Sequence, residues 1–414
     1  MTAVRNAWAT QVFGFEIIDV GGSEPATDLV LPGLRRNPRR AHLLVSTVLG
    51  KHIAVPPAAV VDAGHRLAAC TREVLSDTAA DVDVLGMAET ATSLGHCVAD
   101  GLDAATYIHT TRRDATPDRV YAAFQEGHSH ATDHTVQPSG ADVFDGARPL
   151  VIVDDEISTG TTALAAIAAL HDVLPRPHYV VSSLVDLRTD AHRDRVRDAA
   201  AELGVPIDFV SLGTGRVVLP EGMTAAVNEL AAPALNPTGA RRGRHRRIAA
   251  DWPATVPEGG RHGFLRTDRA PFDAAVDELA VRVGDALTPG QPVLVIGHEE
   301  LMYLPLRLAD SLTGRGFDTR FQTSTRSPAY VHDAPGYPLR TGFTFHPCER
   351  GEDGSRYMYN GWPGAQAVLV VDAVAATDRV EADGGIVDAL TAAGYDVLVV
   401  VVGGPDADAL ARSR

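Results

Sequence analysis

Short apolar runs alternate with segments of helical periodicity along most of this chain. In the first half, the apolar residues 82–86 and 150–154 are each followed by an alanine-rich stretch, 91–101 and 161–173. Continuous apolar strands that alternate with helices are typical of a parallel sheet whose two faces are both covered. The pattern therefore predicts an α/β fold.

The same pattern returns in the second half, where residues 292–297 and 367–372 are predicted to be buried parallel strands. A stretch with Pro, Gly and the basic cluster 241–247 separates the two halves. A nucleic-acid-binding strip is one interpretation of this cluster, but no aromatic residues are interleaved for base stacking, which favours a solvated linker. We therefore expect a first domain at 1–235, a linker at 236–250 and a second α/β domain at 251–414.

Composition and charge narrow the class of protein. The length of 414 residues agrees with two or three domains, and 45% hydrophobic with 22% charged residues excludes a disordered or fibrous chain. The net charge of −16 argues against nucleic acids and anionic membranes as partners. Of the 37 basic residues only Lys51 is a lysine, which singles out this position.

Cysteine usage and the N-terminal sequence indicate a reducing compartment. Cys70, Cys97 and Cys348 are too few and too scattered for a disulfide framework. The N-terminus lacks a basic segment followed by an apolar core, and no apolar run is long enough to cross a bilayer. We expect a cytoplasmic protein.

The most informative segment is 151–162, with the sequence VIVDDEISTGTT. An apolar strand ends in Asp154 and Asp155, and a Ser/Thr/Gly loop then opens a helix. The loop can surround a phosphate at the helix N-terminus, and the paired carboxylates suit the vicinal hydroxyls of a ribose or a divalent cation. The predicted phosphate loop comprises Ser158, Thr159, Gly160, Thr161 and Thr162.

This strand–loop–helix unit resembles the 5-phosphoribosyl 1-diphosphate (PRPP) motif of type I phosphoribosyltransferases. The resemblance implies that an earlier loop binds the diphosphate through its backbone amides, and that a basic strand end contacts the same group. Arg112 is the preferred residue at that strand end, whereas Arg113 fits a diphosphate contact and a solvated charge equally well. The diphosphate loop would comprise Met87, Ala88, Glu89 and Thr90.

Three histidines lie in the sequence FQEGHSHATDH at 124–134, between the basic strand end and the acidic motif. Type I enzymes have a mobile loop here that closes over PRPP and excludes water. The resemblance makes His128 and His130 the expected catalytic residues of this lid. Zinc binding through the His-x-His-x-x-x-His spacing and a lid that is merely polar are the alternatives.

The resemblance becomes more specific over the whole chain. The sequence RRNPRR, the segment 44–53 and the motifs GMAETA and VDDEIST together resemble the phosphoribosyltransferase branch found beside tellurite-resistance (Ter) stress genes. Residues 325–328 spell TRSP, the tetrapeptide that names the domain following this branch. The resemblance implies a nucleotide-like product made in the stress response. It also implies a second copy of the chain or the products of neighbouring genes as partners.

The second half repeats the first in outline. The sequence VLVIGHEE parallels VDVLGMAE, and Arg326 and Asp372 follow at nearly the spacing of Arg112 and Asp154. We interpret this as a degenerate duplicate without the phosphate loop; chance recurrence of α/β patterning is the alternative, and an unrelated strand order would exclude duplication. Its polar strand-end set forms either a second site or an interdomain patch: Glu299, Glu300, Tyr303, Arg307, Arg326 and Ser327.

The expected reaction is displacement of diphosphate from C1 of PRPP by a base-like acceptor, with Mg²⁺ held by the substrate and by Asp154 and Asp155. The acceptor would bind in a hood built from 12–51 and 182–219. Lys51 falls in this hood, where its compact charge suits the diphosphate, and a surface position is the alternative. A non-catalytic PRPP sensor remains an open interpretation, and a phosphohydrolase is a weaker one.

Overall fold

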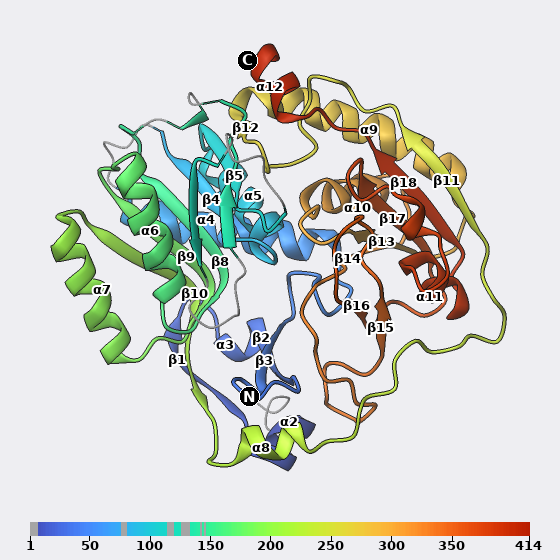
Figure 1. The fold of residues 1–414 in the computed structure, drawn as a ribbon, viewed down its shortest axis with the longest axis horizontal. Coiled ribbons are helices and arrows are strands. Elements are labelled where there is room, and N and C mark those ends of the chain that lie inside the picture. The colour runs from blue at the N-terminus through green and yellow to red at the C-terminus, as the bar shows by residue number, and fades with distance from the viewer. Residues whose placement is uncertain (1–6, 76–80, 114–119, 126–132, 141–142, 145) are drawn as a thin grey trace.

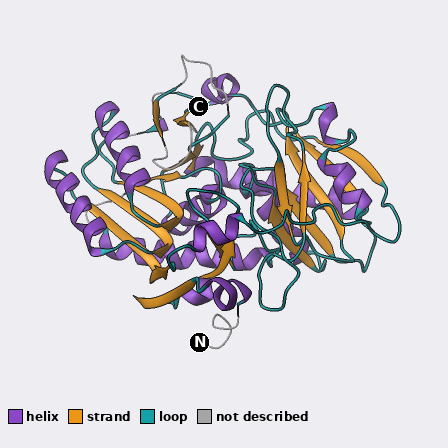
Figure 2. Ribbon diagram, turned by 60° about the horizontal axis from the view of Figure 1, so that its bottom comes forward, coloured by secondary structure: helices purple, strands orange, loops and turns teal. Residues whose placement is uncertain are grey.

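A computed structural model describes residues 7–75, 81–113, 120–125, 133–140, 143–144 and 146–414. Two β-sheets lie on opposite sides of the molecule (Figure 1), and helices occupy the space between them (Figure 2). None of the helices in these residues combines the length and the apolar character that a bilayer span requires. The two sheets with their helices correspond to the two α/β units that the sequence predicted.

The first sheet contains seven strands in the order β1-β10-β9-β8-β4-β5-β12. The five strands from β10 to β5 run parallel, and β1 and β12 pair antiparallel at the two edges. Every residue of β9 is buried, including the polar residues Ser182, Ser183 and Asp186, as expected for a parallel strand covered on both faces. The bounds are β1 Glu16–Gly22, β4 Asp83–Gly86, β5 Thr106–His109, β8 Leu150–Ile157, β9 Tyr179–Asp186, β10 Ile207–Val218 and β12 Phe264–Leu265.

Helices cover both faces of this sheet. On the face towards the molecular centre, Val153 of β8 belongs to one apolar cluster with Leu67 and Leu94. On the outer face, Ile152 packs in a separate cluster with Ile167. The inner helices are α4 (Pro57–Val74) and α5 (Ala91–Leu102), and the outer ones are α6 (Thr161–Val173) and α7 (Asp190–Leu203).

The second sheet has five parallel strands in the order β11-β18-β17-β13-β14. Four of its strands, taken along the chain as β13, β14, β17 and β18, occupy the same relative positions in the sheet as β4, β5, β8 and β9 in the first sheet. The duplication required this agreement. The strands are β11 His245–Ala250, β13 Val293–Gly297, β14 Thr319–Thr323, β17 Gln366–Asp372 and β18 Val397–Val402; the helices are α9 Arg269–Ala286, α10 Tyr303–Gly314, α11 Ile386–Ala392 and α12 Ala407–Ser413.

A β-hairpin is inserted at the same place in each half. In the first half it lies between β5 and β8, and in the second between β14 and β17. Each hairpin also forms an isolated bridge to its own sheet, Thr111 with Thr135 and Thr325 with Tyr357. The hairpin strands are β6 Ala122–Gln125 with β7 Asp133–Val136, and β15 Gly342–Phe345 with β16 Arg356–Tyr359.

The strand register defines which residues of the two halves are equivalent. Gly86 of β4 pairs with His109, three positions before Arg112. Gly297 of β13 pairs with Thr323, three positions before Arg326. These two arginines are therefore equivalent, as their spacing predicted.

The equivalence of the aspartates needs a correction. Counted from the same pairings, Asp372 corresponds to Asp155 and not to Asp154. The sequence spacing pointed to Asp154 because the strand was expected to end at the first carboxylate. In the structure β8 continues through Ile157.

Part of the expected linker is instead a strand. Residues 245–250 form β11, which pairs in parallel with β18 at the edge of the second sheet. Its first three residues, His245, Arg246 and Arg247, are exposed. Charged residues are common on edge strands, so the strand lacked the apolar signature of its neighbours. Conversely, β12 comes from beyond the expected boundary and extends the first sheet.

The N-terminal segment is held between the two domains. It comprises α2 (Trp8–Phe13), α3 (Ala26–Leu29) and the hairpin of β2 (Val30–Leu34) with β3 (His42–Ser46), and α8 (Met223–Asn228) follows the first sheet. The amide of Leu34 donates to the Tyr337 hydroxyl (3.1 Å), and the Tyr330 amide donates to the Leu34 carbonyl (2.7 Å). The inner helices of both domains also share one apolar core, so the two sheets form a continuous structure.

A buried ion cluster links the domains. Arg113, four residues after the end of β5, pairs with Asp372 (2.5 Å) and Glu349 (2.9 Å) in the second domain, and its side chain is only 6% exposed. Arg261 pairs with Asp372 as well (2.9 Å). Burial by itself raises the pKa of Asp372, but the two guanidinium groups hold it well below its usual range. Arg113 is thus neither the solvated charge nor the diphosphate contact that the sequence allowed.

We expect Arg113→Ala to lower the free energy of unfolding by about 3–5 kcal/mol, because it removes one cation from a buried cluster of carboxylates. Urea unfolding measures the change. Arg340→Ala is the matched control, since Arg340 makes an exposed pair with Asp333 and its loss is expected to cost less than about 1 kcal/mol. Equal unfolding midpoints for the two variants would contradict the importance of the buried cluster.

Candidate functional site

A cavity of about 430 Å³ lies at the carboxyl ends of β4, β5 and β8, where parallel α/β sheets bind ligands. Many of the residues that the sequence predicted for the site line this cavity: Lys51, Met87, Ala88, Glu89, Thr90, Arg112, Asp154, Asp155, Ser158, Thr159, Gly160, Thr161 and Thr162. Five further polar residues of the first half line it. Arg35 and Arg40 belong to the expected hood, and His134 is the third histidine of the alternative zinc spacing. His52 and Glu156 had no predicted role of their own at the site.

The acidic pair lies within β8, side by side at the cavity. The Asp155 amide donates to Asp154 Oδ1 (2.9 Å), and both residues are partly buried. Burial raises the pKa of Asp154 well above its ordinary value, and the negative charge of Asp155 raises it further. A bound cation or a hydroxyl donor relieves such repulsion, so this strand end is suited to a ribose or to a hard metal ion.

The phosphate loop connects β8 to α6. Gly160 has φ 82° and ψ −1°, a left-handed conformation that favours glycine, and it forms the N-cap of α6. No side chain caps this helix. The Thr161 amide donates to Thr159 Oγ1 (3.2 Å), and Thr159 Oγ1 donates to the Thr161 hydroxyl (3.0 Å). Amides of the first helical turn and neighbouring hydroxyls together form an anion-binding arrangement.

The loop after β4 lies beside the acidic strand end, but only part of it offers amides to a ligand. The Met87 amide donates to a carbonyl of β8 (2.9 Å), and the Ala88 amide donates to the Thr110 hydroxyl (2.8 Å). Within the described residues, the amides of Glu89 and Thr90 have no protein partner. The resemblance implied four amides for the diphosphate; the geometry leaves these two.

Two cations lie at this loop. Lys51 Nζ donates to the Thr90 hydroxyl, so the only lysine of the chain is positioned in the cavity. Arg112 lines the cavity and lies 3.4 Å from His134 Nε2 through Nη2. His134 in turn forms a hydrogen bond with the Thr110 hydroxyl (2.9 Å). The negative charge of a diphosphate would be balanced at this end.

Several residues of the N-terminal segment, the first half of the predicted hood, line the cavity. Arg40 pairs with Glu156 of β8 (2.7 Å) and donates to His42 (3.1 Å) through Nε. Burial lowers the pKa of His42 to about 4, and the neighbouring arginines add to this effect. The second half of the predicted hood, 182–219, contributes no residue to the cavity lining.

The polar set of the second domain does not form one site. Glu299 is buried and pairs with Arg326 (2.5 Å) and Arg356 (2.5 Å). Arg307 lies on α10 and pairs with Asp273 (3.1 Å). Only Arg326 and Ser327 of this set line the large cavity.

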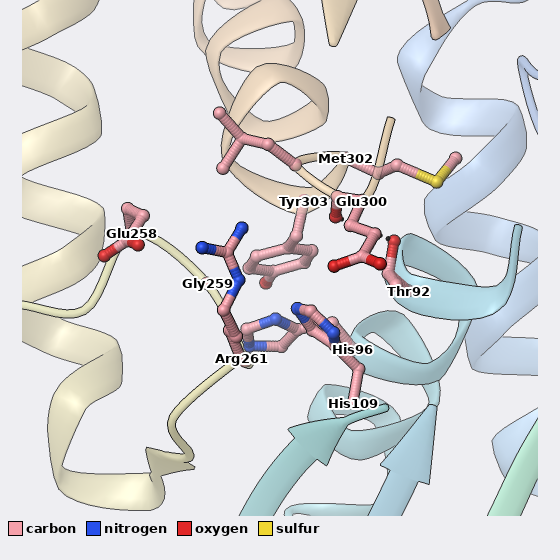
Figure 3. A pocket seen from close by; sticks show the side chains of 11 residues that line it. Thr92, His96, His109, Glu258, Gly259, Arg261, Glu300, Met302 and Tyr303 are labelled. Carbon is pink, nitrogen blue, oxygen red and sulfur yellow. Dashed lines mark hydrogen bonds between the residues drawn. The ribbon is translucent and has the colours of Figure 1, made fainter. Parts of the chain in front are cut away.

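Glu300 and Tyr303 lie at the interface between the domains. Figure 3 shows the Glu300 carboxylate directed towards Thr92 and the ring of Tyr303 next to His96. The two rings stack at 3.5 Å between centroids, and Glu300 Oε2 accepts a hydrogen bond from the Thr111 hydroxyl (2.6 Å). For these residues the interdomain patch is the interpretation that agrees with the geometry.

The expected catalytic histidines, His128 and His130, lie outside the described residues. Within the described part of the chain, the group of three side chains close enough to hold a metal ion is His298, Glu299 and Glu349. Both carboxylates of that group already pair with arginines, so the protein supplies its own cations there.

Comparison with protein families identifies the class that this fold and cavity define. Residues 29–216 match the PRTase_2 model, described as phosphoribosyl transferase, and residues 258–390 match the TRSP domain found C-terminal to it. Together the matches span more than three quarters of the chain. The protein belongs to the family of phosphoribosyl transferases that carry a C-terminal TRSP domain, as the motifs predicted.

Solved structures with detectable similarity include several adenine phosphoribosyltransferases. The one from Rhodothermus marinus is 20% identical over 44% of this chain and 93% of its own, with a TM-score of 0.32. The one from Trypanosoma brucei, in complex with AMP, pyrophosphate and ribose-5-phosphate, is 15% identical over 44% and 76%, with a TM-score of 0.31. A search of curated protein sequences finds no match.

The phosphate loop can be tested with a pair of glycine variants. Gly160→Ala is expected to weaken binding of ribose 5-phosphate about tenfold, since a side chain at positive φ costs roughly 1–2 kcal/mol and shifts the loop. Gly204→Ala, at φ 67° in the C-cap of α7 with no atom within 4 Å of the new Cβ, introduces similar strain away from the cavity. Isothermal titration should show wild-type affinity for this control. Equal affinities of the two variants would exclude the loop as the phosphate site.

Proposed function

We propose that this protein transfers the 5-phosphoribosyl group of PRPP to a nitrogen of a base-like acceptor and releases diphosphate. The proposal rests on one observation above all. An acidic pair, a phosphate loop, the predicted diphosphate loop and the cations Lys51 and Arg112 line a single cavity, which supports the binding of a ribose with a phosphate and a diphosphate.

The proposed chemistry needs control of charge more than a strong base. The acceptor nitrogen forms a bond to C1 while the bond from C1 to the diphosphate oxygen breaks, and diphosphate leaves with the electron pair. Asp154 and Asp155 hold the ribose hydroxyls and face the positive charge that develops on the sugar ring. Lys51 and Arg112 face the departing diphosphate, whose charge they stabilise.

Mg²⁺ fits the available donors. Two adjacent carboxylates offer the oxygen ligands that Mg²⁺ prefers, and the remaining positions would be filled by substrate oxygens and water. When bound, Mg²⁺ neutralises charge on the diphosphate and makes it a better leaving group. A nucleotide-like product with a role in the tellurite stress response, a second copy of the chain and the products of neighbouring genes remain predictions of the resemblance.

A non-catalytic PRPP sensor is the second candidate, because binding needs the same phosphate loop and acidic pair. Titration with PRPP alone, followed by an assay for diphosphate release with purines, pyrimidines and their precursors, separates the two. Release that depends on an acceptor supports the transferase. Binding without release for every acceptor supports the sensor.

Asp155→Asn is expected to reduce PRPP turnover by at least about 100-fold, since it removes one of the two charges that face the developing positive charge. Diphosphate release measures the effect. Asp208→Asn is a suitable control, because Asp208 pairs with His178 in an exposed position of the same sheet and its loss should leave turnover unchanged. Unchanged kinetics in Asp155→Asn would refute the assignment of the acidic pair.

Lys51→Arg preserves the charge but replaces a compact ammonium with a planar fork. If Lys51 contacts the diphosphate next to Thr90, kcat is expected to fall about tenfold or more while the melting temperature stays near that of the wild type. A comparison of kcat and thermal unfolding checks this. Full activity would remove Lys51 from the site.

A further inference from the structure

Two residues of the second domain reach the cavity of the first. Arg326 and Ser327 follow β14 and line the same 430 Å³ cavity as the PRPP motif. Their own half has AVAAT after Asp372, where the first half has the phosphate loop. The strand end of the second half is therefore placed at a ligand site that belongs to the other half.

A reciprocal pair of hydrogen bonds fixes this placement. The Arg326 amide donates to Glu89 Oε2 (3.2 Å) in the diphosphate loop, and the Arg112 amide donates to Glu300 Oε1 (2.8 Å). Glu89 and Glu300 each lie three positions after the equivalent glycines of β4 and β13. Each half thus donates one backbone amide to the equivalent glutamate of the other half, as across the two-fold axis of a dimer. The bond to Glu89 holds Arg326 against the diphosphate loop.

Acidic neighbours hold the Arg326 side chain in a defined orientation. Nε pairs with Glu299 (2.5 Å) and Nη2 with Glu352 (3.1 Å). In the described part of the chain, Nη1 has no partner. The side chain is 21% exposed, so a ligand can reach it. An ordered guanidinium with one open donor is well suited to an anionic oxygen.

We infer that Arg326 of the TRSP domain binds the diphosphate of PRPP, opposite the equivalent Arg112 of the first domain. The inference rests on the proposed function and extends it: the ligand site is complete only when both domains are present. The second half then acts towards the first as a partner subunit acts in a dimer, and it contributes a binding residue instead of a second site.

Arg326→Gln tests the inference because glutamine still donates a hydrogen bond to Glu299 but carries no charge. Titrations use two probes, inorganic diphosphate with Mg²⁺ and ribose 5-phosphate. We expect diphosphate binding to weaken about 10- to 100-fold, as for loss of one charge-assisted contact, and ribose 5-phosphate binding to stay within about twofold of wild type. Arg320→Gln is the control, since Arg320 lies in β14 over the Trp362 ring (4.5 Å) and is absent from the cavity lining.

A second variant gives an effect of opposite sign and does not remove the arginine. Glu352→Gln withdraws one carboxylate from Arg326, so diphosphate affinity is expected to rise about two- to fivefold. Wild-type diphosphate affinity in both variants would overturn the inference and leave the proposed function intact. If the wild-type protein itself binds neither probe, the proposed function fails, and the inference fails with it.

Discussion

A carboxylate buried in one domain and neutralised by an arginine of the other holds this structure together. Asp372 lies at the end of β17, where Arg113 and Arg261 both pair with it. Because an unpaired charge is very unfavourable in the interior, the domains cannot separate without a large loss of stability. The N-terminal segment packs across the same junction through Leu34 and Tyr337. The walls of the large cavity are therefore fixed by the docking of the two halves.

The two halves share strand order, hairpin insertion and register, yet their strand ends have different chemistry. In the first half the acidic strand end faces a cavity beside a glycine-containing loop. In the second half the equivalent aspartate, Asp372, is covered by arginines, and no glycine follows it in the next five residues. In the first half this strand end is open to a cavity, whereas in the second half the equivalent place is filled by the protein's own cations. The TRSP half therefore shares the strand order of the first half but differs from it in the chemistry of its strand ends.

The sequence predicted those parts of the protein whose geometry is local. The strand, acidic pair, loop and helix of 151–173 are contiguous, so their relative positions follow from the backbone. Most buried strands can be recognised in the sequence by their apolar runs. The edge strand β11 was not predicted because its charged residues interrupt the apolar run by which the other strands were recognised. The burial of Arg113 and the position of Arg326 depend on contacts between residues more than 200 positions apart. Those contacts arise only when the domains dock, which no local pattern records.

The duplication within one chain has a consequence for how the molecule responds to dilution. A dimer of separate subunits loses its partner residues when its concentration falls below the dissociation constant, whereas a covalently connected half is always present at a high effective concentration. The reciprocal contacts through Glu89 and Glu300 are in this sense independent of expression level. A fused pair is also free of the symmetry that binds identical subunits: a substitution in the second half changes one surface only. That freedom allows the strand ends of the two halves to differ, as Asp155 beside a cavity and Asp372 beneath arginines do.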